Sequence, residues 1–166
     1  MSLVHSNLAE TTLFPSATAM AATFNDELIY GVGKAIGEEC NMFEVDVLLG
    51  PGVNLKRSPL GGRNFEYYSE DPYLTGKMAT SFINGVQSTN VGACIKHFAL
   101  NEQETNRRFV NTIVDERTLQ ELYLKPFRMA IKDAKPKAIM SSYNKVNGHY
   151  ASESSYLLKD VLREQL

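Results

Sequence analysis

The stretch Ala93-Cys94-Ile95-Lys96-His97 is the starting point for the fold, because its apolar residues lead directly into two ionisable side chains. Similar apolar runs occur on either side of it in the sequence, at Val45–Leu49 and Ala138–Ser142. The apolar residues in these runs are mostly consecutive rather than alternating with polar ones, which is typical of strands buried on both faces of a parallel sheet. The sequence therefore predicts three parallel, buried strands.

Helical patterns alternate with these strands. One helix is predicted over Asn25–Cys40, and a second over Asp71–Val86, where a capping aspartate precedes a proline at the first helical position. A third begins near Asp115 with apolar residues at the three-and-four spacing of a helix packed on one face, and Pro126 is expected to kink it. A fourth covers Ser154–Leu166. This alternation indicates an α/β fold with right-handed crossovers and no internal domain boundary.

Polar and glycine-rich segments follow each predicted strand, at residues 50–63, 98–111 and 143–148. Ligands of parallel α/β folds bind at the carboxyl ends of the strands, so a binding site is expected there. A complete barrel of eight βα units takes about 250 residues. Three strands in 166 residues therefore indicate an incomplete barrel or a small open sheet.

Lys96 and His97 are the first candidates for such a site. Burying them without partners is costly, so they require either internal partners or a ligand. Neighbouring residues of a regular strand point to opposite faces, so one of the two is structural unless the strand ends and twists there. A sugar or an anion would suit the pair.

Two charged loops supply further candidates, each with a simpler alternative. Arg63 is presented by a glycine-containing loop and offers a fork of donors to hydroxyls or carboxylates, or it forms a surface salt bridge with a nearby glutamate such as Glu66. Arg107 lies in a dense polar run and could pair with Glu104 across one turn, although a solvated loop explains the run equally well.

Composition argues against several classes of protein. The net charge is −2 and there is no basic block, which argues against a nucleic-acid partner. No segment has the roughly 20 apolar residues that cross a bilayer, so no membrane association is expected. Three scattered histidines, His5, His97 and His149, make a metal site improbable, and Cys40 and Cys94 are interpreted as buried free thiols rather than a disulfide.

Two further patterns were weighed. Gly31–Gly37 resembles a dinucleotide-binding loop, but it has one residue too many before the last glycine and no strand precedes it, so close helix packing is the preferred interpretation. Met1–His5 lacks the basic-then-apolar pattern of a secretory signal, and the sequence has no Asn-x-Ser/Thr acceptor. A cytoplasmic location is therefore expected.

Taken together, the motifs resemble the N-terminal domain of glycoside hydrolase family 3 from about Leu13 onward. They occur in the family's order and spacing: Phe14–Ala19, Leu49–Asn54, Gly61–Glu66, Ser69–Pro72, Lys96–Phe98, Asn101–Glu104 and Ser142–Gly148. The resemblance implies a partial TIM-like (β/α) barrel over residues 1–166, a retaining β-glucosidase-like activity of the parent enzyme, a β-glucoside or oligosaccharide substrate, and no cofactor or metal. It also implies that the sugar in the first subsite is held by Arg63, Lys96, His97, Arg107 and Tyr143.

The same resemblance places the catalytic carboxylates at positions without a match in this sequence. The nucleophilic aspartate of the family follows the helix that matches Ser154–Leu166, the acid/base glutamate comes from a later domain, and a further sugar-binding aspartate precedes the matched region. No catalytic residue is therefore assigned to this chain, and Glu66, Glu70, Glu102 and Glu104 match positions that are not nucleophilic.

The resemblance leaves alternatives for the activity of this chain, for its branch of the family and for its assembly. The chain could be a catalytically inactive fragment or a carbohydrate-binding module. The segment Ala99–Glu104 is similar to the β-glucosidase pattern rather than to that of the N-acetylhexosaminidases, whereas β-xylosidases share much of the scaffold. The open flanks of an incomplete barrel, at Val45–Leu49 and Ala138–Ser142, predict self-association, with a compact monomer as the alternative.

Overall fold

The computed structural model describes residues 10–166, so the predictions made on Met1–His5 lie outside the described residues. Its main sheet has the order β1-β2-β4, formed by β1 (Val47–Leu48), β2 (Gly92–Phe98) and β4 (Ala138–Ser141). Both pairings are parallel, with Val47 opposite Gly92 and Cys94 opposite Ala138. The three predicted strands and their parallel arrangement are confirmed, and β2 is the central strand.

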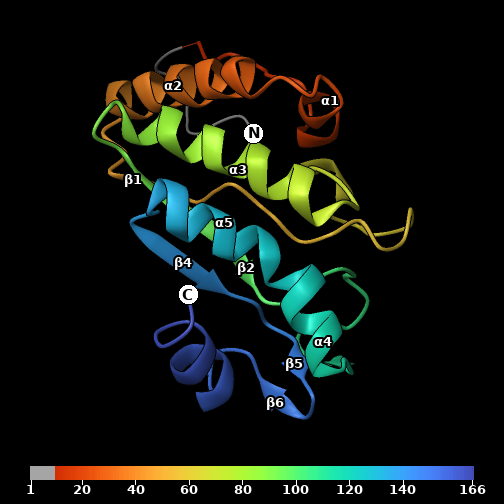
Figure 1. The fold of residues 1–166 in the computed structure, drawn as a ribbon. Helices are drawn as coiled ribbons and strands as arrows, with labels where there is room; N and C mark the ends of the chain where they lie inside the picture. The colour runs from red at the N-terminus through yellow and green to blue at the C-terminus, as the bar shows by residue number, and fades with distance from the viewer. Residues whose placement is uncertain (1–9) are drawn as a thin grey trace.

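Helices connect the strands and pack side by side. The helix α2 (Asp26–Met42) packs on α3 (Pro72–Gln87), which in turn packs on α5 (Lys125–Ala134), as Figure 1 shows. A short helix, α1 (Ala17–Ala21), precedes them and was not among the predicted elements. The predicted cap at Asp71 is confirmed, because its side chain accepts a hydrogen bond from Leu74 N at 2.6 Å. Asn25 caps α2 in the same way.

The third predicted helix is not one kinked helix. It is divided into α4 (Glu116–Thr118), a π-helical turn (Leu119–Tyr123) and α5, with Pro126 in the first turn of α5. Proline is tolerated in a first turn, where its missing N–H has no helical acceptor, so the chain starts a new helix there instead of bending an old one. The fourth prediction is also too long, because the helical segment is a π-helix over Tyr156–Val161.

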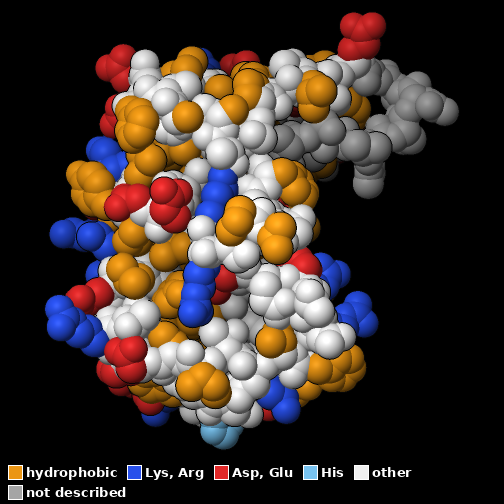
Figure 2. Space-filling view, turned by 90° about the vertical axis from the view of Figure 1, so that its right-hand side faces the viewer, with side chains coloured by type: hydrophobic (Ala, Val, Ile, Leu, Met, Phe, Trp, Pro, Cys, Tyr) orange, Lys and Arg blue, Asp and Glu red, His pale blue; other side chains and the backbone are white. Residues whose placement is uncertain are grey.

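The expectation that all three strands are buried on both faces is wrong for the two outer strands. Every residue of β2 is buried, as predicted, but Val47 in β1 is exposed and all four residues of β4 are only partly buried. Among the residues that the structure describes, the outer strands are sheet edges and lack a neighbouring strand on one side. Figure 2 shows one face of the molecule, on which hydrophobic side chains lie exposed among charged ones.

A small second sheet lies at one end of the molecule, next to α4 (Figure 1). It has the order β3-β5-β6, from β3 (Asn111–Thr112), β5 (Lys145–Val146) and β6 (His149–Tyr150). The turn between β5 and β6 is Asn147-Gly148, and both residues have positive φ angles, 49° and 95°. An Asn-Gly pair is a strong hairpin signal, so this element could have been predicted from the sequence.

Two of the three glycines in residues 31–37, Gly33 and Gly37, lie in close packing against α3 and the residues that follow it, as predicted, whereas a Cβ atom on Gly31 would meet nothing within 4 Å. A Cβ atom on Gly33 would lie 2.4 Å from the backbone oxygen of Phe82 in α3, and one on Gly85 would lie 2.2 Å from that of Tyr30. Only glycine lets α2 and α3 approach so closely at these positions. Cys40 and Cys94 are buried free thiols, as predicted. Within residues 10–166, no helix is both long enough and apolar enough to cross a bilayer.

Candidate functional site

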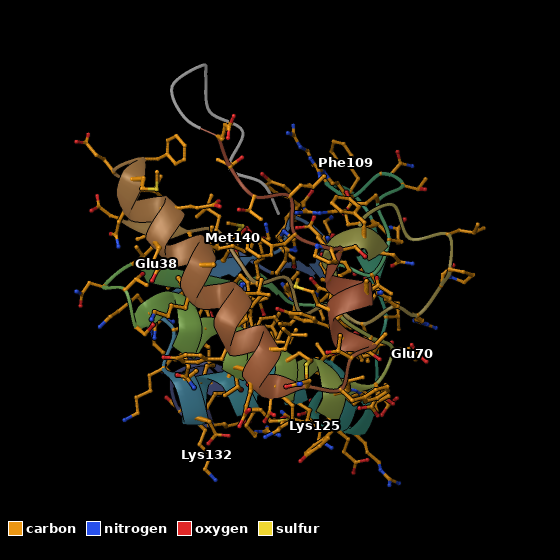
Figure 3. All side chains as sticks on the ribbon, turned by 90° about the horizontal axis from the view of Figure 1, so that it is seen from above. Glu38, Glu70, Phe109, Lys125, Lys132 and Met140 are labelled. Atoms are coloured by element: carbon orange, nitrogen blue, oxygen red, sulfur yellow. The ribbon has the colours of Figure 1, made fainter. Side chains whose placement is uncertain are left out.

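A hollow of about 390 Å³ opens at the carboxyl ends of the main strands. All five residues that the sequence singled out line it: Arg63, Lys96, His97, Arg107 and Tyr143. Leu49, Met140 and Ser141 complete the lining. Met140 lies near the middle of the molecule in Figure 3, whereas Phe109 and Glu70 lie toward its periphery. The structure thus brings together Lys96 and His97 of β2 with residues from the segments that follow β1, β2 and β4.

Lys96 and His97 both face this hollow, although they are neighbours in β2. The pairing register between β2 and β4 shifts between Lys96 and Phe98, so the strand is irregular at this point. Irregularities of this kind re-aim side chains at the end of a strand. The exception stated for this pair therefore applies, because the strand is irregular here and both side chains line the same space.

Glu66 is the charge partner that satisfies two of the cations. Its carboxylate bonds to Arg63 Nε through one oxygen, and the other oxygen lies 3.2 Å from Lys96 Nζ. Burial alone would raise the pKa of Glu66, but the hydrogen bond to Arg63 and the charge of Lys96 outweigh it and hold the pKa below its usual value. The predicted Arg63–Glu66 salt bridge exists, but its side chains are only 20% and 13% exposed, and Glu66 also pairs with Lys96, so it is not a simple surface pair.

Glu104 is the charge partner of Arg107. Its Oε2 lies 3.0 Å from Arg107 Nη1, which confirms the pairing across one turn. Its Oε1 accepts a hydrogen bond from Asn101 Nδ2 at 2.9 Å. The guanidinium of Arg107 lies over the ring of Tyr143, with 5.3 Å between Cζ and the ring centroid, and Arg108 approaches the same ring at 5.6 Å. These contacts orient the exposed Tyr143 at the rim of the hollow.

His97 is the most buried aromatic residue of the lining, with 4% of its surface exposed. Desolvation lowers its pKa to about 3, and the nearby positive charges of Arg63 and Lys96 act in the same direction. The imidazole is therefore neutral at physiological pH. Behind it stand Asn54 and Tyr67, whose side chains both lie 3.2 Å from Nδ1.

These supporting residues were not identified as functional from the sequence. Asn54, Tyr67 and Asn101 are buried polar residues within the quoted motifs or next to them, and only their spatial pairing with His97 and Glu104 reveals a role. Glu102 is different: desolvation raises the pKa of its carboxyl group to about 8, but it does not line the hollow. No aspartate or glutamate is present among the described lining residues.

Comparison with known proteins identifies the family. The profile of the "Glycosyl hydrolase family 3 N terminal domain" matches residues 4–166. This chain belongs to glycosyl hydrolase family 3. Over 159 residues it is 56% identical to the thermostable β-glucosidase B of Acetivibrio thermocellus, covering 96% of this chain and 21% of that protein. Over 154 residues it is 50% identical to an exo-α-(1→6)-L-arabinopyranosidase of Bifidobacterium longum, covering 93% and 20%.

Solved structures of β-glucosidases agree with this assignment. The structure of β-glucosidase 3B from Thermotoga neapolitana in complex with glucose superposes with a TM-score of 0.94 at 57% identity, over 98% of this chain and 23% of that one. The fold is accordingly that of part of a family 3 N-terminal, TIM-like barrel domain. The chain spans about a fifth of the length of the curated relatives that it matches.

Proposed function

We propose that this chain carries the sugar-binding part of the first subsite of a retaining, β-glucosidase-like glycoside hydrolase. The observation that supports this most directly is the convergence of Arg63, Lys96, His97, Arg107 and Tyr143 on one hollow. We also propose that residues 1–166 form a single incomplete barrel segment rather than two domains. Its main sheet has three strands, whereas a complete barrel of this type has eight.

The charge balance of the hollow favours a neutral sugar over an anion. Arg63 and Lys96 share the carboxylate of Glu66, and Arg107 is paired with Glu104. An anionic ligand would have to compete with these internal carboxylates for the same donors. The remaining N–H groups of the three cations can still donate to sugar hydroxyls, which carry no net charge.

Such a site is also selective. A sugar hydroxyl held by buried polar groups leaves them unpaired when it is missing or misplaced, and this penalises the wrong sugar strongly. The relatives include both β-glucosidases and arabinopyranosidases by name, and we propose glucose as the ligand because β-glucosidases provide most of the matches described. A pentopyranose, including the xylose of β-xylosidases, is the competing ligand.

Binding of the sugar can be tested separately from hydrolysis. Titration of the ¹⁵N-labelled protein with glucose should shift the amide signals of the five proposed sugar-binding residues, and xylose or L-arabinose should shift them less. Arg63→Lys keeps the charge but loses the fork of donors, so we expect the dissociation constant for glucose to rise about tenfold, which corresponds to one good hydrogen bond. Arg117→Ala removes an exposed arginine elsewhere and is the matched control. An unchanged spectrum at saturating glucose would contradict the proposal.

Hydrolysis distinguishes the enzymatic interpretation from a binding module. A retaining glycosidase needs two carboxyl groups about 5 Å apart. Because no described lining residue carries a carboxyl group, we expect the 166-residue chain on its own to leave a chromogenic aryl β-glucoside intact while still binding glucose. Turnover that disappears when a residue of this chain is replaced would show that the chain supplies the catalytic groups itself.

A further inference from the structure

Asn54 is tied to the backbone of His97 by two hydrogen bonds. Its Oδ1 accepts from His97 N at 2.9 Å, and its Nδ2 donates to His97 O at 3.0 Å. A backbone N–H can only donate and a carbonyl can only accept, so these bonds determine which end of the amide is oxygen. The side chain is buried, with 2% of the residue exposed, and has no other orientation that satisfies both groups.

That orientation places an acceptor next to the imidazole. Asn54 Oδ1 also lies 3.2 Å from His97 Nδ1. If Nδ1 carried no hydrogen, its lone pair would face the lone pairs of this oxygen inside a buried site. With a hydrogen on Nδ1, the same contact becomes a hydrogen bond.

Tyr67 supports the same assignment. Its hydroxyl accepts a hydrogen bond from Asn101 Nδ2 at 3.0 Å and can donate its single hydrogen to Asn101 O at 3.2 Å. The Asn101 amide is itself oriented, because the same Nδ2 donates to Glu104 Oε1 at 2.9 Å. The Tyr67 oxygen, 3.2 Å from His97 Nδ1, is then free to act as a second acceptor for an Nδ1–H group.

We infer that Asn54 is a positioning residue that holds His97 as its Nδ1–H tautomer and thereby makes Nε2 a hydrogen-bond acceptor toward the hollow. A sugar hydroxyl would then donate to Nε2 while the surrounding cations donate to other hydroxyls. This second step rests on the proposed function. It divides the roles in the hollow, because Arg63, Lys96 and Arg107 can only donate, whereas His97 accepts.

The tautomer can be measured without any ligand. In the protein labelled with ¹⁵N-histidine, we expect the two-bond spectrum of His97 to show Nδ1 with the shift of a protonated ring nitrogen and Nε2 with that of an unprotonated one. The signals are assigned with His97→Asn. The opposite pattern in the unaltered protein would overturn the inference, even if glucose binds. The expected pattern supports it whether or not glucose binds, so the two proposals fail separately.

Variants test whether Asn54 is the cause. Asn54→Asp retains an acceptor at Oδ1 and should keep the Nδ1–H form, whereas Asn54→Leu should produce a mixture with a substantial Nε2–H population. Asn144→Ala is the matched control, because it removes another buried amide that bonds to Ala99 O rather than to His97. If Asn54→Leu folds and keeps a pure Nδ1–H form, the role of Asn54 is refuted. If it does not fold, the Asn54→Asp spectrum decides, and a switch to Nε2–H there would equally refute the role.

Discussion

The ammonium group of Lys96 lies 3.2 Å from Oε2 of Glu66, and only 6% and 13% of the two side chains are exposed. Removing one member of a largely buried ion pair leaves the other without compensation, which is more damaging than losing an exposed pair. Glu66 is also the partner of Arg63, so it compensates two cations at once.

The first prediction follows from this pair. Glu66→Gln should lower the free energy of unfolding at pH 7 by about 3–5 kcal/mol, because Lys96 and Arg63 lose their shared counter-charge. Urea denaturation measures this. Glu38→Gln breaks the exposed Lys34–Glu38 pair and is the matched control, with an expected loss below about 1 kcal/mol. Equal losses in the two variants would show that Glu66 has no special role.

The pH dependence of this pair has a definite sign. The folded-state pKa of Glu66 is below its ordinary value of 4.5, so its stabilising contribution is fully present above that pH. The contribution is lost as the pH falls through the lower, folded-state pKa. The difference in stability between the unaltered protein and Glu66→Gln should therefore shrink below about pH 4.5.

The second prediction concerns His97. Its pKa is about 3 in the folded protein and ordinarily 6.5, so below pH 6.5 the unfolded chain binds a proton that the folded chain does not. Stability should fall by about 1.4 kcal/mol for each pH unit between pH 6 and pH 5 on account of His97. Glu102, with a raised pKa of about 8, acts with the opposite sign over this interval. The measurable quantity is therefore the slope that His97→Asn removes.

Chemical denaturation at several pH values gives the slope of stability against pH for the unaltered protein and for His97→Asn. His149→Asn replaces an exposed histidine and controls for the loss of an imidazole as such. If His149→Asn removes as much of the slope as His97→Asn does, the assignment to His97 is wrong.

The third prediction uses the helix contact between α2 and α3. Gly33→Ala would place a Cβ atom 2.4 Å from Phe82 O, so the two helices must separate, at a cost of about 1–3 kcal/mol. Gly31 is in the same helix, and a Cβ atom there meets nothing within 4 Å. Gly31→Ala should instead stabilise the protein by about 0.5–1 kcal/mol, because alanine is the better helix former. Thermal unfolding of both variants distinguishes them, and a shift of the same sign would contradict the packing argument.

The parts of this fold that the sequence predicted are those controlled by local signals. Asn25 and Asp71 start their helices through their own side chains, and the apolar run before Lys96 is long enough to identify the central strand. The division of the third helix depends on long-range packing, because its π-helical turn closes with a bond from Leu124 N to Leu119 O that no local preference specifies.

The proposed sugar-binding residues could be named from the sequence, whereas the contacts that support them could not. The five proposed sugar-binding residues came from the resemblance to the family, and the structure places them around one hollow. The connection between Asn54 and His97 joins residues 43 positions apart, and nothing in either motif indicates that one orients the other. The exposure of β1 and β4 likewise depends on what lies beside the sheet, which an apolar pattern does not report.

The last prediction is that the 166-residue chain self-associates through the edges of its main sheet. Within residues 10–166 the outer strands β1 and β4 each lack a neighbouring strand on one side, and Val47 of β1 is 39% exposed. Unpaired strand edges with apolar side chains favour pairing with another copy, most simply in a two-fold dimer. Sedimentation velocity over the micromolar range should show a concentration-dependent dimer. Val47→Lys places a charge at the edge and should weaken the dimer at least tenfold. Phe24→Lys, which replaces an exposed residue between α1 and α2, is the matched control. A monomer at every concentration would refute the prediction, and equal weakening by both variants would place the contact elsewhere.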